Sequence, residues 1–512
     1  MLRFLTRRLL AGLATLFVAL FLMYILVDIA IDPLADLRES TAPNKAQLME
    51  ARTAQLELDT NVVVRFFHWL GDVLQGDLGI AWRSGEQVSS LVSHAIVSTL
   101  QLVTVATLLS LVLGITVGIV SALRQYATFD YLIIFVSFLL YSLPSFWVAV
   151  LLKQWGAIGF NDFLADPVIA YPVMIAFALL AGVLWMLAIG GAVARRLQVF
   201  GIATAATFLM FLYLQISDWW STPEIGPILL LIAGGGTAFA IAAIFAGLHN
   251  RRALWSALTV VGIGLVAYFV MQPVFKLDVF GPSGQGAGWV LFVLAIVTVA
   301  VGWLIGRLYG GPDWGISART GAAVAFVMGL LIVIDKVLQV WPAYSRALGG
   351  RPIPTFGDKT PGLGGNFWVQ TLDAFTHLIL PTITLVLIAF AAYTRYSRSS
   401  MLEVMNQDYI RTARAKGLPE RVVVVRHGFR NTLIPLATIV PIDVITLIGG
   451  AVITEAVFAR PGMGQLFVKS LGDAEQDPVM AYLLITASLA IIANIVADLI
   501  YAVIDPRIRL DA

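Results

Sequence analysis

Apolar stretches of about 20 residues recur along the whole of this 512-residue chain, and short polar joints separate them. A helix of about 20 apolar residues crosses the hydrocarbon layer of a bilayer, so each stretch is a candidate membrane span. About twelve spans are expected, at residues 9–30, 98–121, 131–152, 168–190, 198–215, 226–247, 254–273, 288–307, 321–341, 377–397, 435–458 and 479–503. Only 12% of the residues are charged and 59% are hydrophobic, which is more apolar surface than one soluble core could bury. The sequence therefore predicts an all-α polytopic membrane protein.

The joints between the spans differ in charge. Most of the 33 lysine and arginine residues lie in alternate joints, with pairs such as Arg195-Arg196 and Arg251-Arg252. Cytoplasmic loops of membrane proteins are enriched in lysine and arginine. The alternation therefore predicts that both termini are cytoplasmic and that the middle block, residues 166–341, contains an even number of spans. The net charge is only +2, which gives no argument for a nucleic-acid partner.

The last third of the chain contains a polar segment, residues 408–435. Asp408 is a plausible N-cap of a short helix, and Gly417 is placed to end that helix in the left-handed conformation. Arg414 and Lys416 fall in the last turn, where the helix dipole favours cations. The helix is too short and too polar to cross a membrane, so we expect it on the cytoplasmic face. From the residues alone, an amphipathic linker held by anionic lipid explains the segment equally well.

Five motifs resemble those of ATP-binding-cassette importer permeases of the dipeptide, oligopeptide and nickel branch. In the polar segment, Arg411-Thr412-Ala413 precede Gly417 with the spacing of that family's signature, Glu-Ala-Ala followed by three residues and Gly. Arg411 occupies the position of the family's Glu. The other four are GDLGIAWRSG at 76–85, SLPSFW at 142–147, ARPGMGQLF at 459–467 and DLIYAVIDPRIR at 498–509. The chain is thus similar to oligopeptide permease B-type subunits over residues 1–152 and 342–512.

The resemblance implies a six-span type I importer permease core into which about six further transmembrane helices are inserted. The implied divisions are an anchor at 1–30, an external cap at 31–97, core spans two and three at 98–152, the inserted block at 153–341, an external loop at 342–376 and core spans four to six at 377–512. The inserted block has no counterpart in the family. An even number of inserted spans returns the chain to the same side of the membrane, which agrees with the charge pattern.

The resemblance also implies a function, namely that of a permease subunit importing di- and oligopeptides or similar small solutes across the bacterial plasma membrane. The implied partners are a second homologous permease, two cytoplasmic ATP-binding subunits, an extracellular or periplasmic solute-binding protein and membrane lipid. The helix at 408–417 would dock on an ATP-binding subunit, because Ala413, Ala415 and Gly417 permit close approach. The residues to which the resemblance gives this coupling role are Tyr409, Arg411, Thr412, Ala413, Arg414, Ala415, Lys416 and Gly417.

The sequence offers little for chemistry on the chain itself. It contains no motif of the form G-x-x-x-x-G-K-[ST], so ATP and Mg are expected on the partner subunits and no cofactor on this chain. With no cysteine and five scattered histidines, no metal site and no catalytic residue are assigned. Four positions within the spans are candidates for the translocation pathway, namely Pro144, Trp147, Asp443 and Asn494. Packing explains Trp147 at least as well.

Other functions fit parts of the sequence. A stand-alone secondary transporter could also have about twelve spans, but it would show ionisable groups at the midplane and two related halves, and neither is visible. A membrane-embedded enzyme in the inserted block would need a cluster of acids, bases or metal ligands, which the block lacks. Within the importer class, a nickel chelate, glutathione or a sugar are alternative solutes.

Overall fold

The computed structural model describes residues 2–504 except 42, 283, 285, 312–313 and 449–450. For residues 2–5, 437–438, 441–442, 444–446, 448 and 497–504 it describes the backbone alone. The described chain is mainly helical, and its only strands, β1 (Ile80–Ala81) and β2 (Glu86–Gln87), form a short antiparallel hairpin. The side chains of the motif at 498–509 lie outside the described residues.

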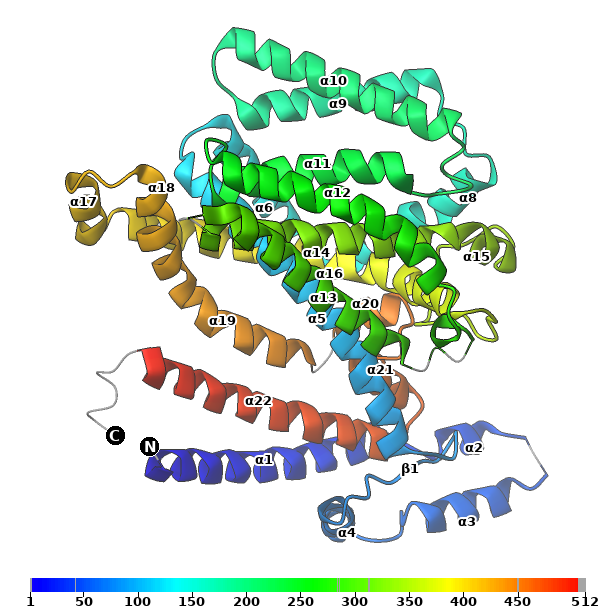
Figure 1. Ribbon diagram of the computed structural model, residues 1–512. Helices are drawn as coiled ribbons and strands as arrows, with labels where there is room; N and C mark the ends of the chain where they lie inside the picture. The colour runs from blue at the N-terminus through cyan, green and yellow to red at the C-terminus, as the bar shows by residue number, and fades with distance from the viewer. Residues whose placement is uncertain are drawn as a thin grey trace.

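The helices are numbered in chain order (Figure 1). They are α1 (Leu2–Ala30), α2 (Ala35–Glu39), α3 (Lys45–Gln55), α4 (Val62–Leu74), α5 (Val88–Leu123), α6 (Thr128–Ser142), α7 (Ser145–Leu151), α8 (Phe160–Ala165), α9 (Tyr171–Ile189), α10 (Val193–Ile216), α11 (Gly226–Phe245), α12 (Arg251–Val274), α13 (Ala287–Gly310), α14 (Trp314–Gln339), α15 (Trp341–Ala347), α16 (Phe367–Met405), α17 (Asp408–Ala415), α18 (Glu420–Val422), α19 (Arg430–Ile448), α20 (Val452–Val457), α21 (Met463–Gly472) and α22 (Gln476–Ile504). The described residues also include two π-helical segments, η1 (Leu152–Gly159) and η4 (Val423–Phe429), and a 3-10 turn, η2 (Asp278–Phe280).

Ten helices in the described part of the chain are long and apolar enough to cross a membrane, and they coincide with ten of the predicted spans. These include all six helices of the inserted block, α9–α14. The prediction of an all-α polytopic membrane protein is therefore confirmed. Two spans differ in detail. The stretch predicted at 131–152 is a bent pair, in which the helix ending at Ser142 and the helix beginning at Ser145 meet at 99°. The stretch predicted at 435–458 is divided between α19 and the short α20.

The spanning helices share two ends (Figure 1). The start of α1, the short helix α17 and α18 lie on the left of the view, which we call the α17 end. The short helices α2, α3 and α15 lie on the right, which we call the α15 end. Successive long helices run alternately between these ends, as spans of one membrane layer must.

Helices α5 and α16 lie at the centre of the fold. Their backbones approach each other closely. A Cβ atom at Gly118 would lie 2.6 Å from the carbonyl oxygen of Thr394, and one at Gly114 would lie 2.7 Å from the Cβ of Tyr393. The two helices contain 36 and 39 residues. At 1.5 Å per residue they are each longer than 50 Å, roughly, and so extend well beyond a hydrocarbon layer of about 30 Å.

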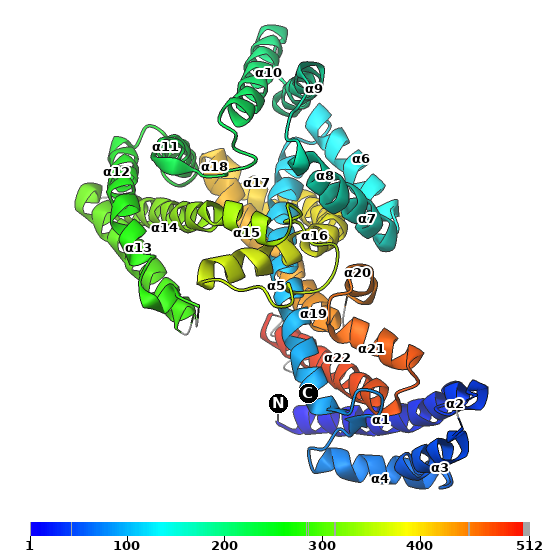
Figure 2. The same cartoon turned by 90° about the vertical axis from the view of Figure 1, so that its right-hand side faces the viewer.

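The inserted helices form a group of their own. In Figures 1 and 2, α1 and α22 lie at the bottom and α9–α12 toward the top, with α5 and α16 between them. Residues of α11, α12, α13 and α14 share one apolar core, which also takes in Trp368 of α16. The buried carboxylate of Asp335 accepts hydrogen bonds from the backbone N–H groups of Ile225 and Gly226, at 2.7 and 3.0 Å. Asp335, in the last inserted span, thus caps the start of α11.

The insertion leaves and rejoins the rest of the chain at neighbouring points. The amide of Asn161 in α8 donates to the carbonyl oxygen of Ile353 at 2.7 Å and accepts from its N–H at 3.0 Å. Arg351 and Asp162 form an exposed ion pair beside it, at 3.0 Å. The two residues of the amide contact are 192 positions apart in the sequence.

The segment between α1 and α5 packs at the α15 end through α4. Its Phe66 and Trp69 are buried against Tyr24 of α1 and Met480 of α22. Arg65 is also buried and forms an ion pair with Asp28 at 2.7 Å. An amphipathic helix with one apolar face explains why this segment folds onto the bundle.

Candidate functional site

The short helix α17 is amphipathic, and its apolar side packs onto its own chain. Ile410 is fully buried and Ala413 is 5% exposed, and both contact Val423 at the start of η4, with Met405 alongside. Ile410 and Ala413 are three positions apart, so they lie on one face of the helix. Burial of this face holds α17 against η4 and the end of α16.

The ends of α17 follow from local sequence. Gly417 has a φ of +74°, the left-handed conformation expected for it, and its N–H donates to the carbonyl oxygen of Arg414 at 2.9 Å. The predicted N-cap is wrong by one residue, because Gln407 occupies that position and makes no side-chain capping bond. Asp408 lies in the first turn instead, where its charge favours the helix dipole.

The opposite side of α17 is polar and faces solvent. Tyr409, Arg411, Thr412, Arg414, Ala415 and Lys416 are all exposed. Arg411 pairs with Asp408 at 3.5 Å, and Arg414 pairs with Glu420 at 2.6 Å. The hydrogen bond from Arg414 lowers the pKa of the Glu420 carboxyl below its ordinary value. The net charge of this face is therefore positive but partly compensated within the chain.

The position of Ala413 differs from the expectation that it permits close approach of a partner. Its side chain is buried against Val423, so it permits close approach of η4 instead. The small residues that remain on the exposed side of the helix are Ala415 and Gly417. The structure thus divides the predicted coupling residues into an inward set and an outward set.

Helix α17 is attached to the long helices on both sides of it. A Cβ atom at Gly428 of η4 would lie 3.1 Å from the Cε of Met401 in α16, so the two backbones pack closely. At the start of α19, Asn431 donates to the hydroxyl of Tyr409 at 2.9 Å, and the carbonyl oxygen of Thr432 accepts from Ser400 at 3.2 Å. A displacement of α17 would therefore be passed to α16 and α19.

An ion pair fixes the α17 end of α16 to the first turn of α6. Arg398 donates to both carboxylate oxygens of Asp130, which is 1% exposed. Ser121 and the N–H of Tyr126 donate to the same carboxylate, at 2.5 and 3.0 Å. Four hydrogen bonds to one buried carboxylate compensate for its loss of hydration. Sequence analysis did not single out either residue of this pair.

At the α15 end, a second buried carboxylate holds the loop that carries ARPGMGQLF. Glu455 of α20 accepts from the hydroxyl of Thr99 at 2.7 Å and from the N–H groups of Gly464 and Gln465 at 2.7 and 3.2 Å. It thereby caps the start of α21. A Cβ atom at Gly462 would overlap the Glu455 carboxylate, which explains a glycine at that position.

Arg460 lies beside this cap and is 1% exposed. It donates to the side-chain oxygen of Gln101 at 3.3 Å, and burial lowers the pKa of its guanidinium from the ordinary value. Sequence analysis missed Glu455 and noted Arg460 only as part of the motif at 459–467, although an isolated acid and an arginine in an otherwise apolar stretch are a signal for a buried polar contact.

A third polar cluster closes the same end around Asp373 of α16. Thr360 donates to it through both its N–H, at 2.9 Å, and its hydroxyl, at 2.6 Å, and the buried Tyr344 hydroxyl donates at 3.0 Å. The N–H of Gly357 donates to the carbonyl oxygen of Phe458 at 2.9 Å. The loop between α15 and α16 is thereby fixed to α16 and to the end of α20.

The four candidate pathway residues lie on separate elements. Pro144 precedes α7 at the 99° bend, and Trp147 is 46% exposed on α7. Asp443 of α19 accepts a hydrogen bond from Tyr393 of α16 at 3.1 Å, and Asn494 is exposed on α22. Among the described residues, no hydrogen bond joins any two of the four. Their role in a pathway stays a prediction.

Comparison with known proteins identifies relatives. The family described as "Binding-protein-dependent transport system inner membrane component" matches residues 114–510, which is more than half of the chain. The oligopeptide transport system permease protein of Bacillus subtilis is 41% identical over 206 residues, which are 40% of this chain and 61% of that protein. The oligopeptide transport system permease protein of Mycobacterium tuberculosis is 38% identical over 184 residues, 36% of this chain and 55% of its own length.

A dipeptide transport system permease protein is also similar. That of Escherichia coli is 43% identical over 148 residues, which are 29% of this chain and 42% of the relative. The chain thus spans about half the length of the curated relatives it matches.

Proposed function

The chain belongs to the family of inner membrane components of binding-protein-dependent transport systems, and on this premise we propose that it is one permease subunit of an ATP-driven importer of di- or oligopeptides. The names of the similar proteins, which are oligopeptide and dipeptide permeases, support a peptide as the solute. The proposed location is a bacterial plasma membrane, with the α17 end and both termini on the cytoplasmic side.

The observation that carries this proposal is the division of α17 into two faces. Its apolar face is occupied by η4 and α16, whereas its basic face is open. A helix that served only as a linker would need no open face held at a fixed angle between two spans. We propose that Tyr409, Arg411, Lys416 and the exposed Ala415 contact an ATP-binding subunit, and that Gly417 keeps the following chain clear of it.

The other partners follow from the same assignment. The sequence has no G-x-x-x-x-G-K-[ST] motif, so ATP and Mg are bound by two partner subunits in this proposal. A second, homologous permease completes the pathway. A solute-binding protein delivers the peptide at the α15 end, where α2–α4 and the loop before α16 lie (Figure 1).

The test is purification of the complete transporter with its ATP-binding subunits, followed by measurement of peptide-stimulated ATP hydrolysis and of uptake of a labelled dipeptide into proteoliposomes. The double variant Arg411→Glu and Lys416→Glu should lose most of both activities. Its matched control is Arg195→Glu and Arg196→Glu, which reverses two exposed positive charges at the start of α10, away from α17. Peptide uptake driven by an ion gradient without any ATP-binding subunit would show a secondary transporter instead.

A further inference from the structure

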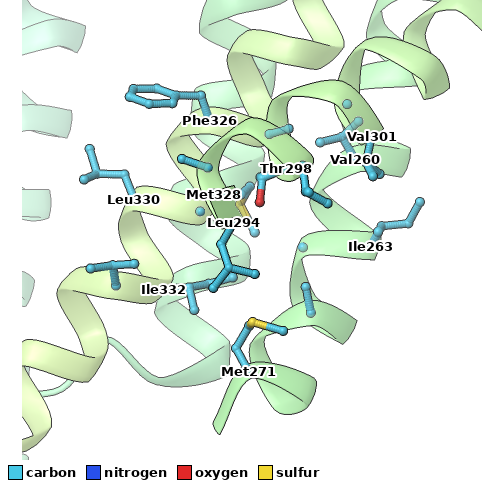
Figure 3. A pocket seen from close by; sticks show the side chains of 18 of the residues that line it. Val260, Ile263, Met271, Leu294, Thr298, Val301, Phe326, Met328, Leu330 and Ile332 are labelled. Carbon is cyan, nitrogen blue, oxygen red and sulfur yellow. The ribbon is translucent and has the colours of Figure 1, made fainter. Parts of the chain in front are cut away.

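The inserted block contains an apolar groove between α12, α13 and α14, with a cavity volume of about 410 Å³. Figure 3 shows side chains from the three helices around it, including Met271, Leu294 and Met328. Thr298 supplies the only hydroxyl among the residues that line it, and no charged residue lines it. Small residues of all three helices are among those that line the groove, namely Gly264, Ala267, Ala295, Gly302, Ala325 and Gly329. A Cβ atom at Gly264 would lie 2.6 Å from the Cε of Met328, so the helices pack closely beside the groove.

The position of the groove restricts what can fill it. All three helices are long and apolar enough to cross a membrane, so the groove lies at the depth of the hydrocarbon layer. Along α13 it extends from Leu291 to Ile305. At 1.5 Å per residue this is about 21 Å, more than half the roughly 30 Å thickness of the layer. An elongated apolar space at this depth matches the shape and polarity of an acyl chain.

Two lysines lie at the α15 end of the same groove. Lys276 directly follows the lining residue Phe275, and Lys336 lies three residues after the lining residue Val333, on the same face of α14. Both lysines lie at the α15 ends of α12 and α14, two helices that share one apolar core, so two positive charges border the same end of the groove. Lys336 donates to the side-chain oxygen of Gln339 at 3.2 Å. An anion between the two ammonium groups would relieve their repulsion.

The nearest buried acid does not supply this anion. The carboxylate of Asp335 already accepts from Ile225 and Gly226 of the α11 start, and its other oxygen accepts from Gln339 at 2.7 Å. Asp278 is exposed beside Lys276, but among the described residues it makes no ion pair with either lysine. The positive charges of Lys276 and Lys336 are therefore available to bind an external phosphate.

We propose that this groove binds one acyl chain of an anionic phospholipid, with the lipid phosphate held between Lys276 and Lys336. The site makes the inserted block a lipid-binding element of the subunit. The proposal rests on the membrane placement of α12–α14 and not on the solute or the energy source of transport.

The experiment uses the full chain in nanodiscs that contain phosphatidylglycerol or phosphatidylcholine with a photoreactive group on one acyl chain. Cross-linked peptides are identified by mass spectrometry. With phosphatidylglycerol, labels should concentrate on groove residues such as Leu294, Thr298 and Met328. Unlabelled phosphatidylglycerol should compete for these positions, and phosphatidylcholine should compete roughly tenfold less well, because two lysines attract the anionic headgroup.

Two pairs of variants distinguish lipid binding in the groove from lipid contact with the general lipid-facing surface. Ala295→Phe fills the groove, whereas Ala300→Phe adds the same volume to the same helix at a residue outside the lining. Lys276→Glu with Lys336→Glu reverses the mouth charges, and Lys359→Glu with Lys469→Glu makes the same change at exposed sites elsewhere. Only the first member of each pair should abolish groove labelling.

Labels spread evenly over α10 and the outer faces of α12–α14, with no preference for phosphatidylglycerol, would overturn the proposal. Equal labelling of the groove in Ala295→Phe and Ala300→Phe would do the same. If a groove variant fails to fold, competition by the two unlabelled lipids on the unmodified chain decides the question alone.

Discussion

The guanidinium of Arg398 donates to both carboxylate oxygens of Asp130, at 2.7 and 2.9 Å. The bond ties α16 to the first turn of α6, seven positions before α16 ends at Met405. The position of the exposed basic face of α17 therefore depends on a buried ion pair near the end of α16.

Asp130→Ala should destabilise the protein strongly, because it leaves the charge of Arg398 without its partner. The expected loss is about 3–5 kcal/mol, measured by thermal unfolding in detergent. Glu420→Ala removes one partner of the exposed pair with Arg414 and should cost less than about 1 kcal/mol. Similar losses in the two variants would mean that the Asp130 pair is not effectively buried.

Gly417→Val should impair transport without unfolding the subunit. A β-branched residue in the left-handed conformation costs roughly 1–2 kcal/mol, and no atom lies within 4 Å of the added Cβ, so the effect is confined to the backbone. Gly190→Val introduces the same strain at φ +65° between α9 and α10, also in open space. The Gly417 variant alone should lose peptide-stimulated ATP hydrolysis. Normal hydrolysis in both would identify α17 as a simple linker.

Ala413→Phe and Ala415→Phe should act by different routes, since Ala413 is buried and Ala415 is exposed. The first should separate α17 from η4 and raise hydrogen exchange of the α17 backbone in the isolated subunit. The second should leave this exchange unchanged and reduce co-purification of the ATP-binding subunits. Reduced co-purification with unchanged exchange in Ala413→Phe would contradict the inward position of Ala413.

Gly464→Ala should destabilise the α15 end, because its Cβ atom would lie 2.5 Å from the Cα of Val452 and 3.0 Å from the Glu455 carboxylate. Overpacking of this kind costs about 1–3 kcal/mol. Gly472→Ala, in the same helix α21, meets no atom within 4 Å and serves as the control. The readout is the unfolding temperature of the two variants, and a difference below measurement error would argue against the tight cap at Glu455.

Deletion of residues 166–341, closed by a short linker, should leave a subunit that still assembles with its partners. The ends of the insertion are already adjacent through Asn161 and Ile353, so the linker need not cross the fold. Trp368 would lose its packing on Phe275 and Phe280, which predicts a lower unfolding temperature. Peptide cross-links to α9–α14 in the intact transporter would show that the insertion belongs to the pathway.

Sequence reasoning succeeded where a property is local. Hydrophobic length located the spans, and Gly417 marked the end of α17 in the left-handed conformation it adopts. The angle of the bend at Pro144 could not be predicted, because a proline shows where a helix can break but not by what angle.

Contacts between residues far apart in the sequence could not be predicted. Glu455 and Thr99 are 356 positions apart, and nothing in either neighbourhood predicts their hydrogen bond. The inward position of Ala413 depends likewise on how η4 folds back against α16. A periodic pattern shows that a helix has an apolar face but not whether a partner or its own chain covers it.

The unbroken helix α16 connects the two ends of the molecule. Arg398 fixes the part of α16 that leads into α17, and Asp373 holds the loop before α16. The two residues are 25 positions apart, which is about 38 Å along a straight helix. A movement of the end of α16 next to α17 would therefore tilt its other end and the loop attached there. Force could thus reach the far side of the membrane through one rigid rod, without passing through the solute.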